Sequence, residues 1–204
     1  MRYEGDMMTM TDAIELLRCD HDEIRRLLSA LEQSALEQSA LEQSALGGDP
    51  AVAGMASEGP VAHLVIAASG HEAIEEQHFW PLVRRRVQDG SRLADEGVSQ
   101  EQDVKRLLDL LERPDQDPDL LRQVIAASRA HIDFEETRVW PGVRLALSEQ
   151  ELGDLGAQLE QAKRLAPTRP HPHLPCTPEV LKVAAPIAGA ADRIRDVLGG
   201  RHRD

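Results

Sequence analysis

The feature of this sequence that most constrains its fold is a motif that occurs twice, sixty residues apart. The first copy, HEAIEEQHFWPLVRR, spans residues 71–85, and the second, HIDFEETRVWPGVRL, spans residues 131–145. Each copy places a histidine four residues before a glutamate, and residues four apart lie on the same face of an α-helix. The repeat therefore predicts two related helices, each of which presents an imidazole beside a carboxylate.

A second repeat relates the segments that precede these two motifs. The segment HDEIRRLLSALE, which begins at His21, matches EQDVKRLLDLLE, which begins at Glu101, eighty residues later. Apolar residues recur in both at intervals of three and four, the pattern of an amphipathic helix, and strand-like alternation is absent. The sequence thus predicts two related helical hairpins, an all-α chain and an up-down-up-down four-helix bundle.

Prolines, glycines and helix caps divide the chain into three parts. We expect a flexible N-terminus over residues 1–9, the bundle over residues 10–147 and a helical C-terminal extension over residues 148–204 with a proline-rich linker at 167–178. The first helix should be capped by Thr11 or Asp12, and three copies of LEQSA at residues 31–45 lengthen it or the loop that follows. The other helices are expected at 61–87, 95–112, 118–147, 148–165 and 179–198.

Composition excludes several kinds of partner and places the chain in a cell compartment. The 36 acidic residues outnumber the 23 basic ones, giving a net charge of −13, which argues against nucleic acid or an anionic membrane as a partner. The two cysteines are too few for a disulfide framework, and no apolar run approaches the roughly 20 residues of a membrane span. A cytoplasmic protein is the simplest interpretation.

The amphipathic pattern brings six polar side chains into the interior of the predicted bundle. They are three histidines and three glutamates: His21, His71, Glu75, Glu101, His131 and Glu135. Helical phase favours Glu101 over its neighbour Gln102 as the group that points inward. Unpaired buried charge is costly, and we expect no lysine or arginine at the same level of the bundle. Metal cations are then the natural counter-charge, as in di-iron helical bundles.

These motifs resemble those of the hemerythrin-like (HHE cation-binding) family of non-heme di-iron bundles, over roughly residues 10–147. The resemblance implies His21, His71, Glu75, His131 and Glu135 as iron ligands, with Glu75 and Glu135 bridging. It implies two iron ions, oxo- or hydroxo-bridged, although imidazole and carboxylate ligands also accept manganese or zinc. Members of the family usually carry histidine on the third helix, where this chain has Glu101 and Lys105.

The substitution on the third helix bears on function, because a carboxylate in place of an imidazole favours more oxidised iron. The sequence therefore predicts a protein that binds or reacts with dioxygen, peroxide or nitric oxide as a sensor, scavenger or iron handler, rather than a reversible oxygen carrier. The alternatives are a peroxide-decomposing or oxidase-like di-iron enzyme, and a metal-free helical interaction module that forms a homodimer through its C-terminal extension. Four residues are candidates to support the ligands without binding metal: His78, Glu76, Glu136 and Gln102.

Overall fold

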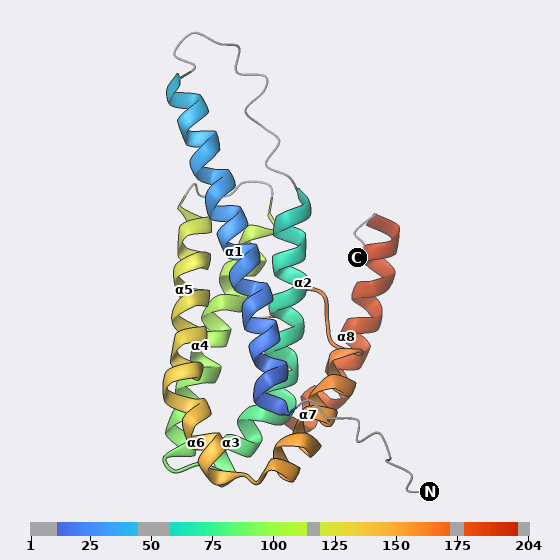
Figure 1. Cartoon of the computed structure of the whole chain (residues 1–204). Coiled ribbons are helices and arrows are strands. Elements are labelled where there is room, and N and C mark those ends of the chain that lie inside the picture. Colours follow the sequence, from blue (N-terminus) through green and yellow to red (C-terminus); the bar gives the residue numbers. More distant parts are fainter. Residues whose placement is uncertain (1–11, 45–57, 114–118, 172–177, 200–204) are drawn as a thin grey trace, which may run out of the picture.

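The predicted up-down-up-down four-helix bundle is confirmed. The computed structural model describes residues 12–44, 58–113, 119–171 and 178–199, and its regular elements within these ranges are all helical. Four helical runs lie side by side and alternate in direction (Figure 1). They are α1 (Ala13–Ser44); α2 (Glu58–Ile74), continued by η2 (Glu75–Phe79) and α3 (Trp80–Arg86); α4 (Gly90–Leu111); and α5 (Leu120–Phe134), continued by η3 (Glu135–Val139) and α6 (Trp140–Ala146).

The apolar interior of the bundle is divided into two clusters with a polar layer between them. The lower cluster is centred on Ile14, Leu17, Phe79, Val83 and Val143, and the upper one on Leu28, Leu64, Val65, Leu108 and Val124. Burying one such side chain contributes about 1.5–3 kcal/mol. In α1, His21 lies between Leu17 and Leu28, and all three are fully buried. Apolar packing on both sides therefore encloses the polar layer.

The two prolines of the repeated motif act through π-helical segments rather than through simple kinks. Each segment, η2 or η3, ends just before the Trp-Pro pair. The Trp80 N–H donates to the carbonyl of Glu75, five residues back, and Trp140 bonds Glu135 in the same way. Because proline cannot donate an α-helical hydrogen bond, a wider turn before it accommodates the loss. The extra residue in the turn changes which side chains share a face.

The LEQSA repeat lengthens the first helix rather than the loop. The Asp12 carboxylate accepts from the Glu15 N–H (3.0 Å) and thus caps α1, which continues to Ser44. Its upper part extends above the other bundle helices (Figure 1). The Leu36 side chain is exposed there, as expected for a five-residue repeat that cannot keep its leucines on one face. The first leucine of the repeat, Leu31, is buried in the upper core cluster, and the part of the repeat that follows it adds length to α1.

The third bundle helix begins earlier than the sequence indicated. We expected it to start near residue 95, but α4 begins at Gly90, directly after a short turn. Asp89 has a positive φ of 56°, a conformation that aspartate tolerates better than most residues. A Cβ on Gly90 would clash with the Val83 carbonyl, so glycine permits the close approach of α3 and α4. The start expected for the fourth helix, residue 118, lies outside the described residues.

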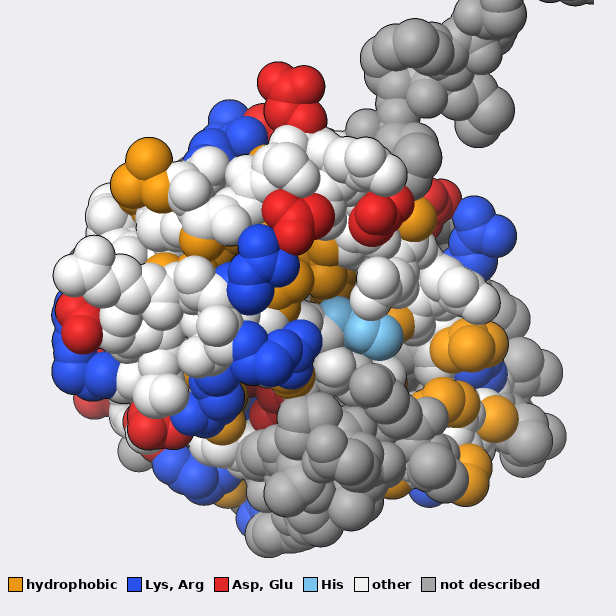
Figure 2. All heavy atoms as spheres, turned by 90° about the horizontal axis from the view of Figure 1, so that it is seen from below, with side chains coloured by type: hydrophobic (Ala, Val, Ile, Leu, Met, Phe, Trp, Pro, Cys, Tyr) orange, Lys and Arg blue, Asp and Glu red, His pale blue; other side chains and the backbone are white. Residues whose placement is uncertain are grey.

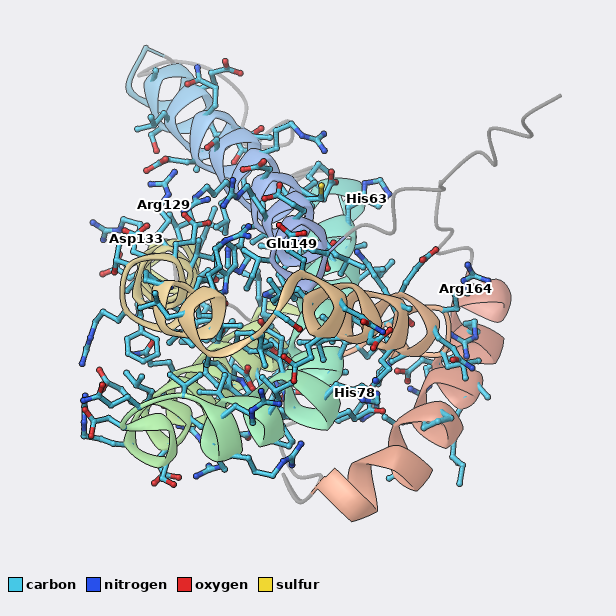
Figure 3. All side chains as sticks on the ribbon, turned by 60° about the horizontal axis from the view of Figure 1, so that its bottom comes forward. His63, His78, Arg129, Asp133, Glu149 and Arg164 are labelled. Atoms are coloured by element: carbon cyan, nitrogen blue, oxygen red, sulfur yellow. The ribbon has the colours of Figure 1, made fainter. Side chains whose placement is uncertain are left out.

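The C-terminal extension packs against the bundle. A capping box precedes α7 (Glu149–Lys163): the Ser148 hydroxyl accepts from the Glu151 N–H (3.3 Å), and the Glu151 carboxylate accepts from the Ser148 N–H (2.9 Å). It starts α7, which packs on α1 and α2, and α8 (Pro178–Gly199) packs on η2. Figure 3 shows Glu149 and Arg164 at the two ends of α7. The apolar face of α7 joins the lower core cluster.

The lower end of the bundle carries side chains of both charges, as Figure 2 shows. Arg86 of α3 pairs with Glu151 of α7 (2.8 Å), and Arg144 of α6 pairs with Glu15 of α1 (2.9 Å). Each exposed pair contributes at most about 1 kcal/mol. Together they connect the ends of helices that are distant in sequence.

Candidate metal centre

The six polar side chains predicted from the sequence converge inside the bundle and form two overlapping groups. The first group is His21, His71, Glu75 and Glu135, and the second is Glu75, Glu101, His131 and Glu135. Within each group, one nitrogen or oxygen atom from every residue lies within 4.8 Å of the others. All six residues are buried. Glu75 and Glu135 belong to both groups, so their carboxylates lie between the two sets of donors.

The atoms that meet in this layer are mostly lone-pair donors. The His21 Nε2 atom lies 3.1 Å from His71 Nε2 and 3.0 Å from the Glu135 carboxylate. The His71 Nε2 atom is also 3.2 Å from the Glu75 carboxylate, and His131 Nε2 is 3.4 Å from that of Glu135. Atoms of this kind repel one another unless a proton or a cation lies between them. The arrangement therefore suits cation binding.

The burial of these side chains means that the negative charges of the carboxylates need a positive partner. Both carboxylate oxygens of Glu75 and of Glu135, one oxygen of Glu101 and the His131 Nε2 atom are buried without a hydrogen-bond partner. Burial and the neighbouring carboxylates raise the pKa of Glu75 and Glu101 well above the usual range, and burial also raises the pKa of Glu135. Burial lowers the pKa of His131 to about 4, so its imidazole is neutral and free to bind a metal. Each of the two donor groups could therefore hold a metal ion.

The Nδ1 atom of each histidine faces a polar partner outside the cluster. The partner of His21 is Glu136, at 2.9 Å. That of His71 is Asp20, at 3.5 Å, and that of His131 is Gln100, at 3.3 Å. Such partners fix the ring orientation and leave Nε2 to the metal. Glu136 was anticipated as a supporting residue. Asp20 and Gln100 were not, because these contacts join different helices and have no sequence signature.

Each tryptophan of the repeated motif contacts one side chain of the polar layer. Trp140 stacks on the His21 ring, with 4.8 Å between centroids and 14° between planes. The Trp80 Nε1–H donates to the Glu101 carboxylate. Residues 21 and 101 are equivalent in the longer sequence repeat, so the two tryptophans occupy related positions. A tryptophan therefore stands before the proline in both copies of the motif because it contacts the polar layer as well as packing in the core.

Replacing Gly97 by alanine is expected to disturb this arrangement. A Cβ at Gly97 would overlap the Trp80 indole, which holds Glu101 one turn further along α4. Overpacking of this kind costs about 1–3 kcal/mol. We expect Gly97→Ala to lower the free energy of unfolding by that amount, measured by chemical denaturation, and to weaken metal binding. Gly59→Ala is the control, because nothing lies within 4 Å of its added Cβ. Equal stabilities of the two variants would contradict the expectation.

The expectation that no basic residue lies at this level is wrong, because the Lys105 side chain is buried one turn from Glu101. Its ammonium lies 2.7 Å from the Glu76 carboxylate. Burial opposes the charge, but Glu76, Glu72 and Glu101 raise the pKa of Lys105 to about 12. Residues four apart on α4 share a face, so the lysine follows Glu101 into the interior. It offsets one carboxylate and leaves the shared glutamates uncompensated.

Two acidic residues and one amide residue, Glu72, Glu76 and Gln102, lie close to Lys105 and the donor groups. Gln102 donates to the Glu76 carboxylate (3.0 Å), whereas Glu101 belongs to the second donor group. Glu76 is thus held by Lys105 and Gln102. Glu72 was missed by sequence reasoning. It is buried, and burial raises its pKa to about 8.

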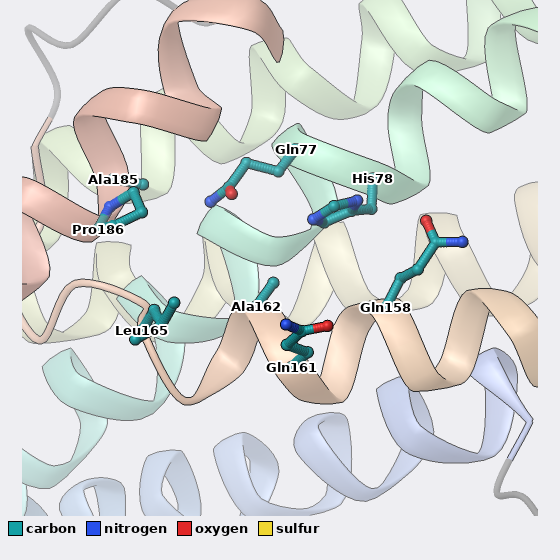
Figure 4. Close-up of a pocket in the computed structure, with 8 residues that line it drawn as sticks. All are labelled: Gln77, His78, Gln158, Gln161, Ala162, Leu165, Ala185 and Pro186. Carbon is teal, nitrogen blue, oxygen red and sulfur yellow. The ribbon is translucent and has the colours of Figure 1, made fainter.

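His78 does not share the face of His71. Their spacing of seven residues would align them on an uninterrupted α-helix, but His78 lies within η2, where the turn is wider. Figure 4 shows it at a pocket of about 290 Å³ between η2, α7 and α8, lined by Gln77, His78, Gln158, Gln161, Ala162, Leu165, Ala185 and Pro186. His78 therefore faces the C-terminal extension rather than the donor groups.

This chain forms a four-helix bundle with two overlapping groups of histidines and glutamates in its interior. Such an arrangement is typical of helical metal-binding proteins. The Hemerythrin HHE cation binding domain matches residues 12–142, and the chain belongs to this family. An uncharacterised hemerythrin-like protein of the yeast Schizosaccharomyces pombe is 26% identical over 133 residues. That match covers 63% of this chain and 66% of the relative, just under two thirds of its length.

No solved structure matches the chain significantly. Within the described residues, every helix is too short or too polar to cross a lipid bilayer.

Proposed function

We propose that this chain binds two iron ions in the polar layer of its bundle and that the centre binds or reacts with dioxygen, peroxide or nitric oxide. The observation that supports the proposal is the sharing of Glu75 and Glu135 by two buried donor groups. Carboxylates between two cations reduce the repulsion between them, so a shared pair of glutamates is the arrangement that two adjacent metal ions require.

Each residue of the layer has a defined role in this proposal. His21 and His71 would hold one ion, Glu101 and His131 would hold the other, and Glu75 and Glu135 would be available to both. When bound, the iron supplies redox chemistry toward a small oxidant or nitric oxide. The protein orients the three imidazoles through Glu136, Asp20 and Gln100, and its two apolar clusters exclude water from the layer.

The third helix favours reaction with an oxidant over reversible oxygen carriage. Glu101 supplies an anionic oxygen donor where an imidazole would be neutral, and anionic oxygen stabilises more oxidised iron. A peroxide-decomposing enzyme is the second candidate, supported by the three carboxylates of the layer. Oxygen evolution from hydrogen peroxide no faster than with free iron would exclude that candidate.

Removing His71 tests the proposed centre. The metal-free protein, loaded anaerobically with Fe²⁺ and then exposed to dioxygen, peroxide or nitric oxide, should develop a visible absorbance band, and His71→Ala should lose most of it. His78→Ala is the matched control, because it removes an imidazole from the same helical run that faces α7 and α8 instead. A wild-type spectrum unchanged by all three reagents, or a band that survives His71→Ala, would contradict the proposal.

A further inference from the structure

We propose that α7, in the C-terminal extension, positions the metal ligand His71 through an ion pair between Lys163 and Asp20. The inference rests on the proposed function, since it assigns a role to residues that contact a ligand of that centre. Lys163 lies beyond the segment that matches the family, residues 12–142. The contact therefore joins the family-matched segment, which contains Asp20, to the C-terminal extension.

The contacts form a continuous path from the extension to the polar layer. The Lys163 ammonium donates to Oδ1 of Asp20. The other oxygen, Oδ2, lies 3.5 Å from His71 Nδ1, and both atoms are buried without a hydrogen-bond partner in the described part of the chain. Asp20 and His71 are buried. Since Nε2 of His71 faces the first donor group, Nδ1 is the atom through which the protein can orient the ring.

Lys163 is needed because Asp20 also lines a surface pocket. This pocket has a volume of about 400 Å³ and lies between α1, α2 and α7, lined by Asp20, Glu23, His63, Ile66, Ala67, Gly70 and Lys163. Without the ammonium, water in the pocket would compete for Asp20 and the carboxylate would be free to rotate. With Oδ1 held, Oδ2 is directed toward the ring. Lys163 thus restricts Asp20 to the orientation that serves His71.

The helix that carries Lys163 is held firmly enough for this role. Leu152, Leu155 and Leu159 of α7 are buried in the lower core cluster together with Ile14 and Leu17 of α1. α1 carries Asp20, so the two partners of the ion pair are attached to one packed unit. A displacement of α7 would therefore change the contact between Lys163 and Asp20.

The bundle contains a parallel arrangement built from its own residues. Arg25 donates two hydrogen bonds to Glu136 (2.7 and 2.9 Å), and Glu136 in turn faces His21 Nδ1 (2.9 Å). Both arrangements consist of a cation, a carboxylate and an imidazole of the first donor group. The extension thus supplies the cation, Lys163, that pairs with the carboxylate beside His71. The bundle itself supplies the corresponding cation, Arg25, for the carboxylate beside His21.

The test compares Fe²⁺ affinity, measured anaerobically by competition with a chelator, among variants of the full chain. Asp20→Ala should weaken binding about 10–100-fold and Lys163→Met about 10-fold, the range for residues that support a ligand. Lys163→Arg should restore most of the affinity. Arg164→Met is the matched control, because Arg164 is exposed and its ion pair among the described residues is the local one with Glu160. In an Asp20→Ala background, Lys163→Met should cause no further loss.

A second measurement, on the metal-free protein, separates this inference from the proposed function. Long-range proton–nitrogen correlation spectra should show His71 protonated at Nδ1 in the wild type and in Arg164→Met, and mixed tautomers in Lys163→Met. A wild-type chain that binds no iron would overturn the proposed function, whereas the tautomer measurement would still report on Lys163. Wild-type affinity and tautomer in Lys163→Met, or an equal loss of affinity with and without Asp20, would overturn the inference.

Discussion

Replacing Glu75 by glutamine is expected to stabilise the metal-free protein and to destabilise the metal-loaded one. In the metal-free protein, burial and the neighbours Glu135 and Glu101 raise the pKa of Glu75 well above the usual range. Glutamine has the same shape without the charge, so the variant should gain about 1–3 kcal/mol of unfolding free energy. In the loaded protein the same change removes a shared anionic donor, and the order of stability should reverse.

The sign of the pH dependence follows from the same shift. A carboxyl group whose folded pKa is raised binds its proton more tightly in the folded state than in the unfolded state. The contribution to stability is therefore complete below the ordinary value of 4.5 and is lost as the pH rises through the folded pKa. The metal-free wild type should lose stability as the pH rises above 4.5, and Glu75→Gln should show a weaker dependence.

Chemical denaturation with and without bound iron measures both effects. Glu149→Gln is the control, because it makes the same substitution at an exposed position on α7. It should leave both stabilities almost unchanged. A metal-free Glu75→Gln variant less stable than the wild type would mean that the buried carboxylate is compensated within the protein itself.

The two donor groups predict unequal losses of metal for different substitutions. His131 belongs to one group, whereas Glu135 belongs to both. We expect His131→Ala to keep about one iron ion per chain, at the His21 and His71 side, and Glu135→Ala to keep almost none. Without the shared carboxylate, two adjacent cations lose a common anionic donor and repel each other more strongly.

Elemental analysis of the purified variants, normalised to protein concentration, provides the measurement. Gln100→Ala is a useful companion to His131→Ala, because Gln100 contacts the His131 ring from outside the cluster (3.3 Å). It should weaken the binding of the second ion without removing a donor. Equal metal contents in His131→Ala and Glu135→Ala would show that the two groups do not act as separate sites.

The convergence of the six donor side chains was predictable because these residues lie on periodic patterns within single helices. The spacing of four residues from His71 to Glu75 and from His131 to Glu135 fixes their common face regardless of what packs against it. The repeat from His21 to Glu101 adds the other two helices. Wherever the chemistry depended on helical phase alone, sequence reasoning was sufficient to assemble the six residues.

The remaining features depend on tertiary contacts or on local departures from the α-helix. The π-helical turn of η2 moved His78 away from the face of His71, and a pattern of ideal periodicity cannot anticipate that change. Lys105 shares a face with Glu101, but the other two glutamates that stabilise its charge, Glu72 and Glu76, belong to α2 and η2. Asp20, Gln100 and Lys163 meet their partners across helices, and no spacing in the chain encodes those contacts.

The most direct measurement compares the thermal unfolding of the wild-type chain before and after anaerobic titration with Fe²⁺. Saturation should require two equivalents of iron per chain. At a free iron concentration 1,000-fold above the dissociation constant, each site should add about 4 kcal/mol to the free energy of unfolding. A chain that takes up no iron and unfolds at an unchanged temperature would show that three buried glutamates and three imidazoles coexist without cations, as in a metal-free helical interaction module.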